Sequence, residues 1–171
     1  MKEYKKLLVV IDPTTDEQKA LNRAIDLASR INIADPAQPL SITAFFSIFD
    51  FSYEMTTILS SGERDSMRQI VINEKQQWLD DIISLTNTPV KIVSKVVWHN
   101  RPFEAIIDQV IKNKHDLVIK GTHQHDKFKS VVFTPTDWHI LRKCPCPVLL
   151  VKDHEWPLQG NILAALNVGS D

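Results

Sequence analysis

Five short runs of apolar residues are spread along this chain, and they constrain its fold more than any other feature of the sequence. The runs lie at residues 7–11, 40–46, 90–98, 117–119 and 148–151. Their apolarity is mostly continuous rather than alternating, which is typical of strands covered on both faces, as in a parallel sheet. The run at 90–98 alternates in part, so we expect it in a less central position.

Helical patterns fill the gaps between these runs. Apolar residues recur there at intervals of three and four, the spacing that lays one face of a helix on a sheet. The residues expected to face inward are Leu21, Ala24, Ile25, Ala28 and Ile31, then Met67, Ile70, Val71, Trp78, Ile82 and Leu85, then Phe103, Ile106, Ile107, Val110 and Ile111. Strands that alternate with helices predict an α/β protein with a five-stranded parallel doubly wound sheet and helices on both faces.

The stretch after the fourth apolar run is where a binding site is expected. The strand stops at Gly121, and a helix begins later with Thr134 as its N-cap and Pro135 at its first position. Asp137, three residues after the cap, can complete a capping box, as Glu63 can for Ser60. Ligands of open α/β sheets usually bind at the carboxyl ends of the strands, so the search for a site begins at Gly121.

Length and composition limit the class of protein. A chain of 171 residues with a net charge of −1 fits one domain and lacks the basic excess that nucleic-acid binding favours. The first apolar run is far shorter than a membrane span of roughly 20 residues and too short for a signal peptide. We therefore expect a cytoplasmic protein without a membrane span. Cys144 and Cys146 are expected to be reduced packing residues.

The end of the chain resembles its beginning. Residues 161–171 match residues 6–16 in kind, with Asn167 in the place of Asp12. Internal repetition of this sort indicates a second copy of the same module. We predict a domain at 1–152, a linker at 153–160, and at 161–171 the first strand of a truncated second repeat.

Several segments together resemble the universal stress proteins. They are a strand ending at Asp12, the turn at 100–102, the strand and loop at 115–123, and the final segment at 144–151. The resemblance covers essentially all of 1–152. It implies a fold of the adenine nucleotide alpha hydrolase type, and pairing as a homodimer or as a tandem pseudo-dimer, here through the last strand and residues 161–171.

The resemblance also implies a possible cofactor. A subset of the family binds ATP through a G-x2-G-x9-G-[ST] loop, with an aspartate at the position of Asp12 near the base. Here Gly121 is the first glycine, but Gln124 and Thr134 stand at the next two glycine positions, followed by Pro135. Side chains at such positions add bulk, and proline removes an N–H donor from the helix N-terminus. We therefore expect no ATP cofactor.

A pocket of altered chemistry remains. We predict that its ligand-binding residues are Asp12, Pro13, Phe46, Gly121, Thr122, His123, Gln124, Thr134, Pro135 and Thr136. Apolar side chains in the loop after Gly121 and in an excursion at 47–60 would suit an apolar or amphipathic ligand with one polar end. In the alternative, these apolar side chains only close the core, and Asp12 is a turn or helix-capping residue.

Other chemistry has weaker support in the sequence. His123 and His125, with Asp126 next, form an H-x-H pattern that lacks a clear third metal ligand. No nucleophilic catalytic set is placed by spacing. We therefore expect a non-catalytic stress-response module, with no metal, that binds a small ligand or a partner. The alternative is an ATP- or nucleotide-binding protein with weak hydrolysis.

Overall fold

The computed structural model describes residues 4–15, 17–37, 39–52, 60–122 and 133–152. The linker predicted at 153–160 and the repeat predicted at 161–171 lie outside these residues. So do residues 53–59 of the predicted excursion.

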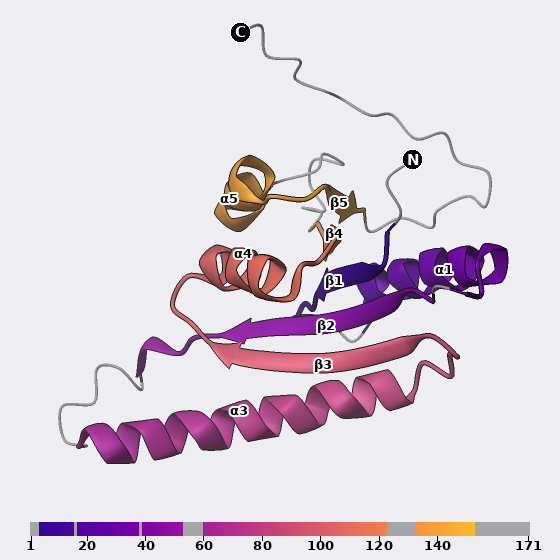
Figure 1. The fold of residues 1–171 in the computed structure, drawn as a ribbon. Coiled ribbons are helices and arrows are strands. Elements are labelled where there is room, and N and C mark those ends of the chain that lie inside the picture. Colours follow the sequence, from indigo (N-terminus) through magenta and orange to yellow (C-terminus); the bar gives the residue numbers. More distant parts are fainter. Residues whose placement is uncertain (1–3, 16, 38, 53–59, 123–132, 153–171) are drawn as a thin grey trace, which may run out of the picture.

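Five parallel strands form one sheet (Figure 1). They are β1 (Lys6–Val10), β2 (Ser41–Ile48), β3 (Lys91–Trp98), β4 (Leu117–Gly121) and β5 (Val148–Val151). Their order across the sheet is β3-β2-β1-β4-β5. The predicted five-stranded parallel sheet is confirmed, and β3 lies at an edge as expected.

Helices cover both faces of this sheet. They are α1 (Lys19–Ala34), α3 (Ser61–Ser84), α4 (Pro102–Asn113) and α5 (Pro135–Lys143). Successive strand residues point to opposite faces, so Leu7 and Val9 join α1 and α3 in one core while Leu8 joins α4 and α5 in the other. The doubly wound arrangement is confirmed. Within the described stretches, every helix is too short or too polar to cross a bilayer.

Both predicted capping boxes are present. The Glu63 backbone N–H donates to Ser60 Oγ over 3.3 Å, and the Asp137 backbone N–H donates to Thr134 Oγ1 over the same distance. In each box the acidic side chain also accepts a hydrogen bond from the N-cap backbone N–H. These bonds satisfy backbone donors that a helix start otherwise leaves unpaired, so the local sequence sets where α3 and α5 begin.

The face of α3 differs from the prediction. Met67, Ile70 and Leu85 were expected to face inward, but their exposed fractions are 37%, 58% and 84%. The inward side chains are centred instead on Leu79, the one fully buried residue of α3. Figure 1 shows the reason: α3 lies along the edge strand β3, and its first turns extend past the end of that strand. Only part of the helix therefore has a sheet to cover, which accounts for Met67 and Ile70. Leu85 lies at the other end, as the C-cap residue after the last residue of α3.

Two further predictions of burial were wrong. Ile111 is 60% exposed, because it lies one residue past the buried Val110 and so turns away from the sheet. The run at 148–151 was expected to be covered on both faces, yet Val148, Leu149 and Leu150 are only half-buried. The cause is the position of β5 at the sheet edge, with β4 as its one neighbour.

The segment between α5 and β5 holds both cysteines. Cys144 and Cys146 are free, and their sulfur atoms lie 3.6 Å apart. Both pack against the core formed by α4 and α5. This placement agrees with a packing role.

Candidate functional site

The candidate site lies at the carboxyl ends of β1 and β4, where the chain leaves β1 for β2 on one side and β4 continues to β5 on the other. Such a switch point leaves a crevice that open α/β sheets use for ligands. A pocket of about 330 Å³ occupies it. Its lining residues are Val10, Ile11, Asp12, Pro13, Thr14, Phe46, Ser47, Pro102, Ile106, Lys120, Gly121, Thr134 and Thr136. We call this the main pocket.

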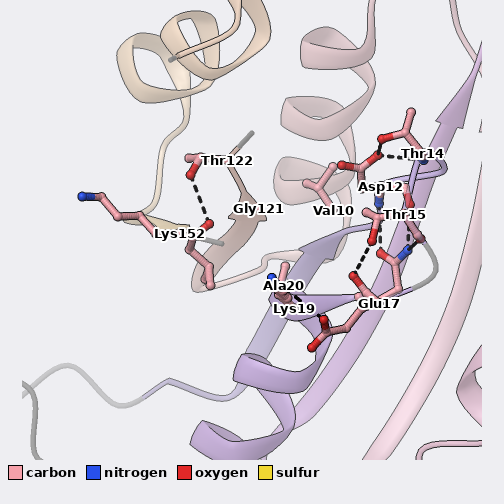
Figure 2. Close-up of a pocket in the computed structure, with 12 residues that line it drawn as sticks. Val10, Asp12, Thr14, Thr15, Glu17, Lys19, Ala20, Gly121, Thr122 and Lys152 are labelled. Atoms are coloured by element: carbon pink, nitrogen blue, oxygen red, sulfur yellow. Dashed lines mark hydrogen bonds and ion pairs between the residues drawn. The ribbon is translucent and has the colours of Figure 1, made fainter. Parts of the chain in front are cut away.

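A smaller hollow of about 200 Å³ adjoins the main pocket and shares Val10, Asp12, Thr14 and Gly121 with it. Figure 2 shows the loop after β1 on one side of this hollow and the ends of β4 and β5 on the other. Because two hollows meet at the same four residues, the crevice extends across the ends of β1 and β4.

The loop after β1 is held in a fixed shape by its own side chains. Asp12 Oδ1 accepts hydrogen bonds from the Thr14 backbone N–H at 2.9 Å and from Thr14 Oγ1 at 2.6 Å. The buried amide of Gln18 donates to the carbonyls of Asp12 and Thr15, and accepts from the Asp12 backbone N–H. Asp12 therefore has the turn role considered in the alternative, and it also lines both hollows.

Gly121 ends β4 without needing the conformational freedom of glycine. Its φ is not positive, and a Cβ added there would meet no atom within 4 Å. Next to it, the backbone N–H and Oγ1 of Thr122 both donate to the Val151 carbonyl, at 2.9 and 3.2 Å. The absence of a side chain at Gly121 therefore leaves space in the crevice rather than permitting a special turn.

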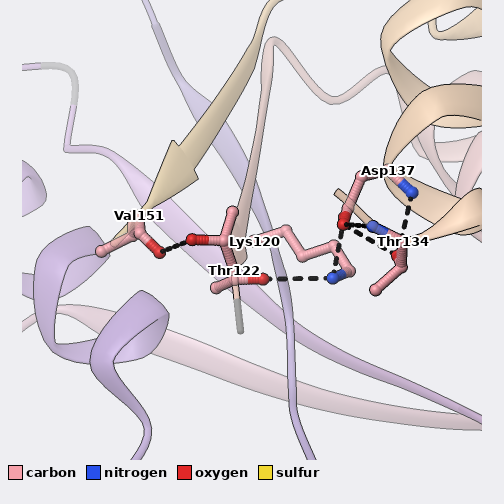
Figure 3. A network of polar contacts seen from close by, with 6 residues as sticks. Lys120, Thr122, Thr134, Asp137 and Val151 are labelled. Atoms are coloured by element: carbon pink, nitrogen blue, oxygen red, sulfur yellow. Dashed lines mark hydrogen bonds and ion pairs between the residues drawn. The ribbon is translucent and has the colours of Figure 1, made fainter. Parts of the chain in front are cut away.

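The start of α5 carries a buried ion pair (Figure 3). Lys120 Nζ lies 2.9 Å from Asp137 Oδ1, and the two side chains are 13% and 0% exposed. The same ammonium donates to the Gly121 carbonyl over 3.1 Å. Asp137 Oδ2 accepts from the backbone N–H and Oγ1 of Thr134 at 2.7 and 2.8 Å. The side chain of Lys120 thus lines the main pocket with its charge already paired.

The rest of the main pocket is largely apolar. Proline rings from the loop after β1 and the start of α4, with Phe46 and Ile106, supply carbon surface. Ser47 also lines the pocket, but its hydroxyl oxygen is buried and has no hydrogen-bond partner among the described residues. Carbon walls with a few polar groups are typical of small-molecule sites.

The structure brings most of the predicted site residues together. Six of them line the main pocket: Asp12, Pro13, Phe46, Gly121, Thr134 and Thr136. Thr122 lines the smaller hollow, and Pro135 opens α5 without lining either. His123 and Gln124 lie outside the described residues.

Several polar residues of the crevice were missed by sequence reasoning, among them Gln18, Ser47 and Lys120. Gln18 reads as a surface residue before a helix, and Ser47 as part of the excursion. Lys120 stands directly after three apolar strand residues, and a lysine in that position is rarely buried without a partner. That rule could have indicated a paired lysine, but only the fold identifies Asp137 as the partner.

The histidines of the described stretches have other contacts. His99 Nδ1 accepts from the Arg101 backbone N–H over 3.1 Å, and the His139 ring stacks on Phe103 at 4.2 Å. The described residues contain no group of three metal-ligating side chains. His123, His125 and Asp126 lie outside them.

Comparisons with known proteins agree with this architecture. The model of the universal stress protein family matches residues 3–152. Universal stress protein E of Escherichia coli (strain K12) is 53% identical over 172 residues, covering 100% of this chain and 52% of that protein. The chain thus spans about half the length of the curated relatives it matches.

Solved structures share the fold at low sequence identity. A universal stress protein family member from Burkholderia pseudomallei has a TM-score of 0.58 and 19% identity, with 86% of this chain and 96% of that chain covered. A universal stress protein in complex with cAMP has a TM-score of 0.50 and 15% identity, with coverage of 86% and 97%. Since the family model spans nearly all of the described fold, the chain belongs to the universal stress protein family.

Proposed function

We propose that this chain is a non-catalytic stress-response module that binds a small apolar or amphipathic ligand in the main pocket, in the cytoplasm. The observation that carries the proposal is the pocket itself, a space of about 330 Å³ with mostly carbon walls at the switch point of the sheet. Its polar groups are few, and Asp12 and Lys120 are already engaged with other residues of the chain. The proposed role is therefore to hold a ligand rather than to transform it.

The start of α5 argues against ATP as that ligand. A triphosphate bound at a helix N-terminus needs free backbone N–H groups. Here Pro135 has no N–H, and the N–H groups of Thr134 and Asp137 are both used within the capping box. Few donors remain for phosphate oxygens, which supports a ligand without a triphosphate.

We also propose that two modules pair through β5, as a homodimer or as a tandem pseudo-dimer. The carbonyls of Pro147 and Val151 face β4, where they accept hydrogen bonds from the backbone N–H groups of Val118 and Thr122. Backbone direction alternates along a strand, so Val148 and Leu150 present theirs to the open side. Residues 161–171 are proposed to contribute to this pairing.

Native mass spectrometry of the purified protein tests the ligand proposal. We expect a small molecule to remain bound, and Gly121→Val to lose it, because the added side chain enters open space in both hollows. Gly62→Val is the matched control, since a Cβ at Gly62 also meets nothing and lies outside the pocket. Equal ligand occupancy in both variants would contradict the proposed site.

The second candidate is nucleotide binding with weak hydrolysis. It is favoured by one observation, the complex of a protein of this fold with cAMP. In this chain it would use Asp12, Gly121, Thr122 and the segment from Thr134 to Thr136. It predicts stabilisation by nucleotide, whereas the favoured proposal predicts none.

A further inference from the structure

We propose that the buried pair of Lys120 and Asp137 makes the main pocket selective for uncharged ligands, because the Asp137 carboxylate fills the anion position at the start of α5. The inference rests on the proposed function, in that it names the ligand class of the same pocket. It assigns Asp137 as a positioning residue that acts through Thr134 and Lys120, both of which line the pocket.

The carboxylate of Asp137 occupies the place where a helix attracts an anion. A helix N-terminus carries a partial positive charge and unpaired N–H groups, and an anion there is stabilised by both. Asp137 is fully buried, and its Oδ2 takes two hydrogen bonds from Thr134, at 2.7 and 2.8 Å. The chain thus supplies its own anion to α5.

The same carboxylate neutralises the one cation of the pocket. Lys120 is the only basic side chain among the described residues that line it, and Lys120 Nζ lies 2.9 Å from Asp137 Oδ1. Asp12 is the only acidic one. A phosphate or carboxylate that entered would meet Asp12 and the paired Lys120, and no uncompensated positive charge.

An uncharged ligand meets no such obstacle. Its carbon surface would contact Pro13, Phe46 and Pro102, and its hydroxyl or amide groups would face Thr136. The chemistry of the walls therefore fits a neutral, partly apolar molecule.

Asp137→Asn tests the inference, because it should make the main pocket bind anions. The amide oxygen can still accept from Thr134, but the negative charge is lost and Lys120 becomes an unpaired cation beside the pocket. With inorganic pyrophosphate as the probe in calorimetric titrations, we expect Asp137→Asn to bind about tenfold or more tightly than the wild type, a gain typical of bonds to a charged group. Lys120→Gln in the same chain should abolish this gain.

Asp108→Asn is the matched control for net charge. Asp108 is an exposed carboxylate on α4, paired with Lys112 at 3.3 Å, and its loss should leave pyrophosphate binding at the wild-type level. Equal binding by Asp137→Asn and Asp108→Asn would overturn the inference. So would wild-type protein that binds pyrophosphate as tightly as Asp137→Asn.

A second measurement covers the case in which Asp137→Asn does not fold. In the wild type, pyrophosphate should leave the amide NMR signals of Thr134 and Thr136 unshifted, and a saturable shift of both would overturn the inference. None of these measurements needs the natural ligand. If no small molecule is carried through purification but Asp137→Asn gains pyrophosphate, the proposed function fails while the charge selectivity stands.

Discussion

His115 shows how a single buried residue can link this fold to pH. It is 6% exposed just before β4, with Nδ1 at 3.2 Å from the Gln109 carbonyl and Nε2 at 3.0 Å from Thr43 Oγ1. A carbonyl only accepts hydrogen bonds, so the neutral ring carries its proton on Nδ1 and accepts from Thr43 through Nε2. Burial lowers the pKa of His115 below 6.5, the bond to Gln109 raises it in part, and the charge of Lys6 lowers it again.

The free energy of unfolding should therefore decrease as the pH falls. Because the pKa of His115 is lower in the folded chain, the unfolded chain binds the proton more readily, and stability is lost as pH falls below about 6.5. Urea unfolding followed from about pH 8 to about pH 5.5 should show this loss in the wild type and a smaller one in His115→Gln. Equal slopes for the two proteins would contradict the assignment.

Among individual residues, those with purely local roles were predictable. Thr134 and Asp137 follow from the capping pattern, and the turn role of Asp12 was one of two alternatives that the sequence left open. The pairing of Lys120 with Asp137 was not predictable, because it joins the end of β4 to the first turn of α5 across a loop. Gln18 was missed for a similar reason: its partners are backbone atoms of a turn whose shape the sequence does not specify.

At the scale of elements, the two edges of the sheet differ. On β3, the side chain of Gln76 reaches from α3, accepts from the Val96 backbone N–H at 3.2 Å and donates to Ser94 Oγ. An N–H group of an edge strand that is bonded in this way is not available for pairing with another chain. On β5, the backbone groups of Val148 and Leu150 face the open side, away from β4.

Removing the Gln76 side chain should change hydrogen exchange on β3. Gln76→Ala leaves the Val96 N–H without its side-chain acceptor, so we expect faster hydrogen exchange at that amide. Gln77→Ala is the control, because Gln77 is exposed and donates to Asp81 on the same helix. An unchanged exchange rate at Val96 in Gln76→Ala would show that the helix does not protect this edge.

Element type was easier to predict than element face. Continuous apolar runs and capping boxes are local patterns, and both predicted the correct strands and helix starts. The inward face of α3 depends on how far the helix extends past β3, and the half-burial of β5 depends on its edge position. Neither can be inferred from the periodicity of one segment, so Met67, Ile70 and Leu150 were predicted to be more buried than they are.

For the molecule as a whole, the pairing proposal assigns the two edges different roles. Leu150→Lys places a charge on the edge strand β5 and should shift sedimentation toward the monomer, because charged side chains on an edge strand disfavour pairing. Val93→Lys puts the same charge on β3, where Val93 is 50% exposed, and should leave the assembly unchanged. A wild type that remains monomeric at high concentration would contradict pairing through β5.

The central claim is that the switch-point pocket holds a small ligand that is not ATP. Its most direct test is the melting temperature of ligand-stripped protein with and without saturating Mg-ATP, since a ligand that binds the folded state raises it. We predict no change, because Pro135 has no N–H and the Thr134 and Asp137 N–H groups at the start of α5 are bonded within the capping box. A rise of several degrees that is lost in Gly121→Val would contradict the claim.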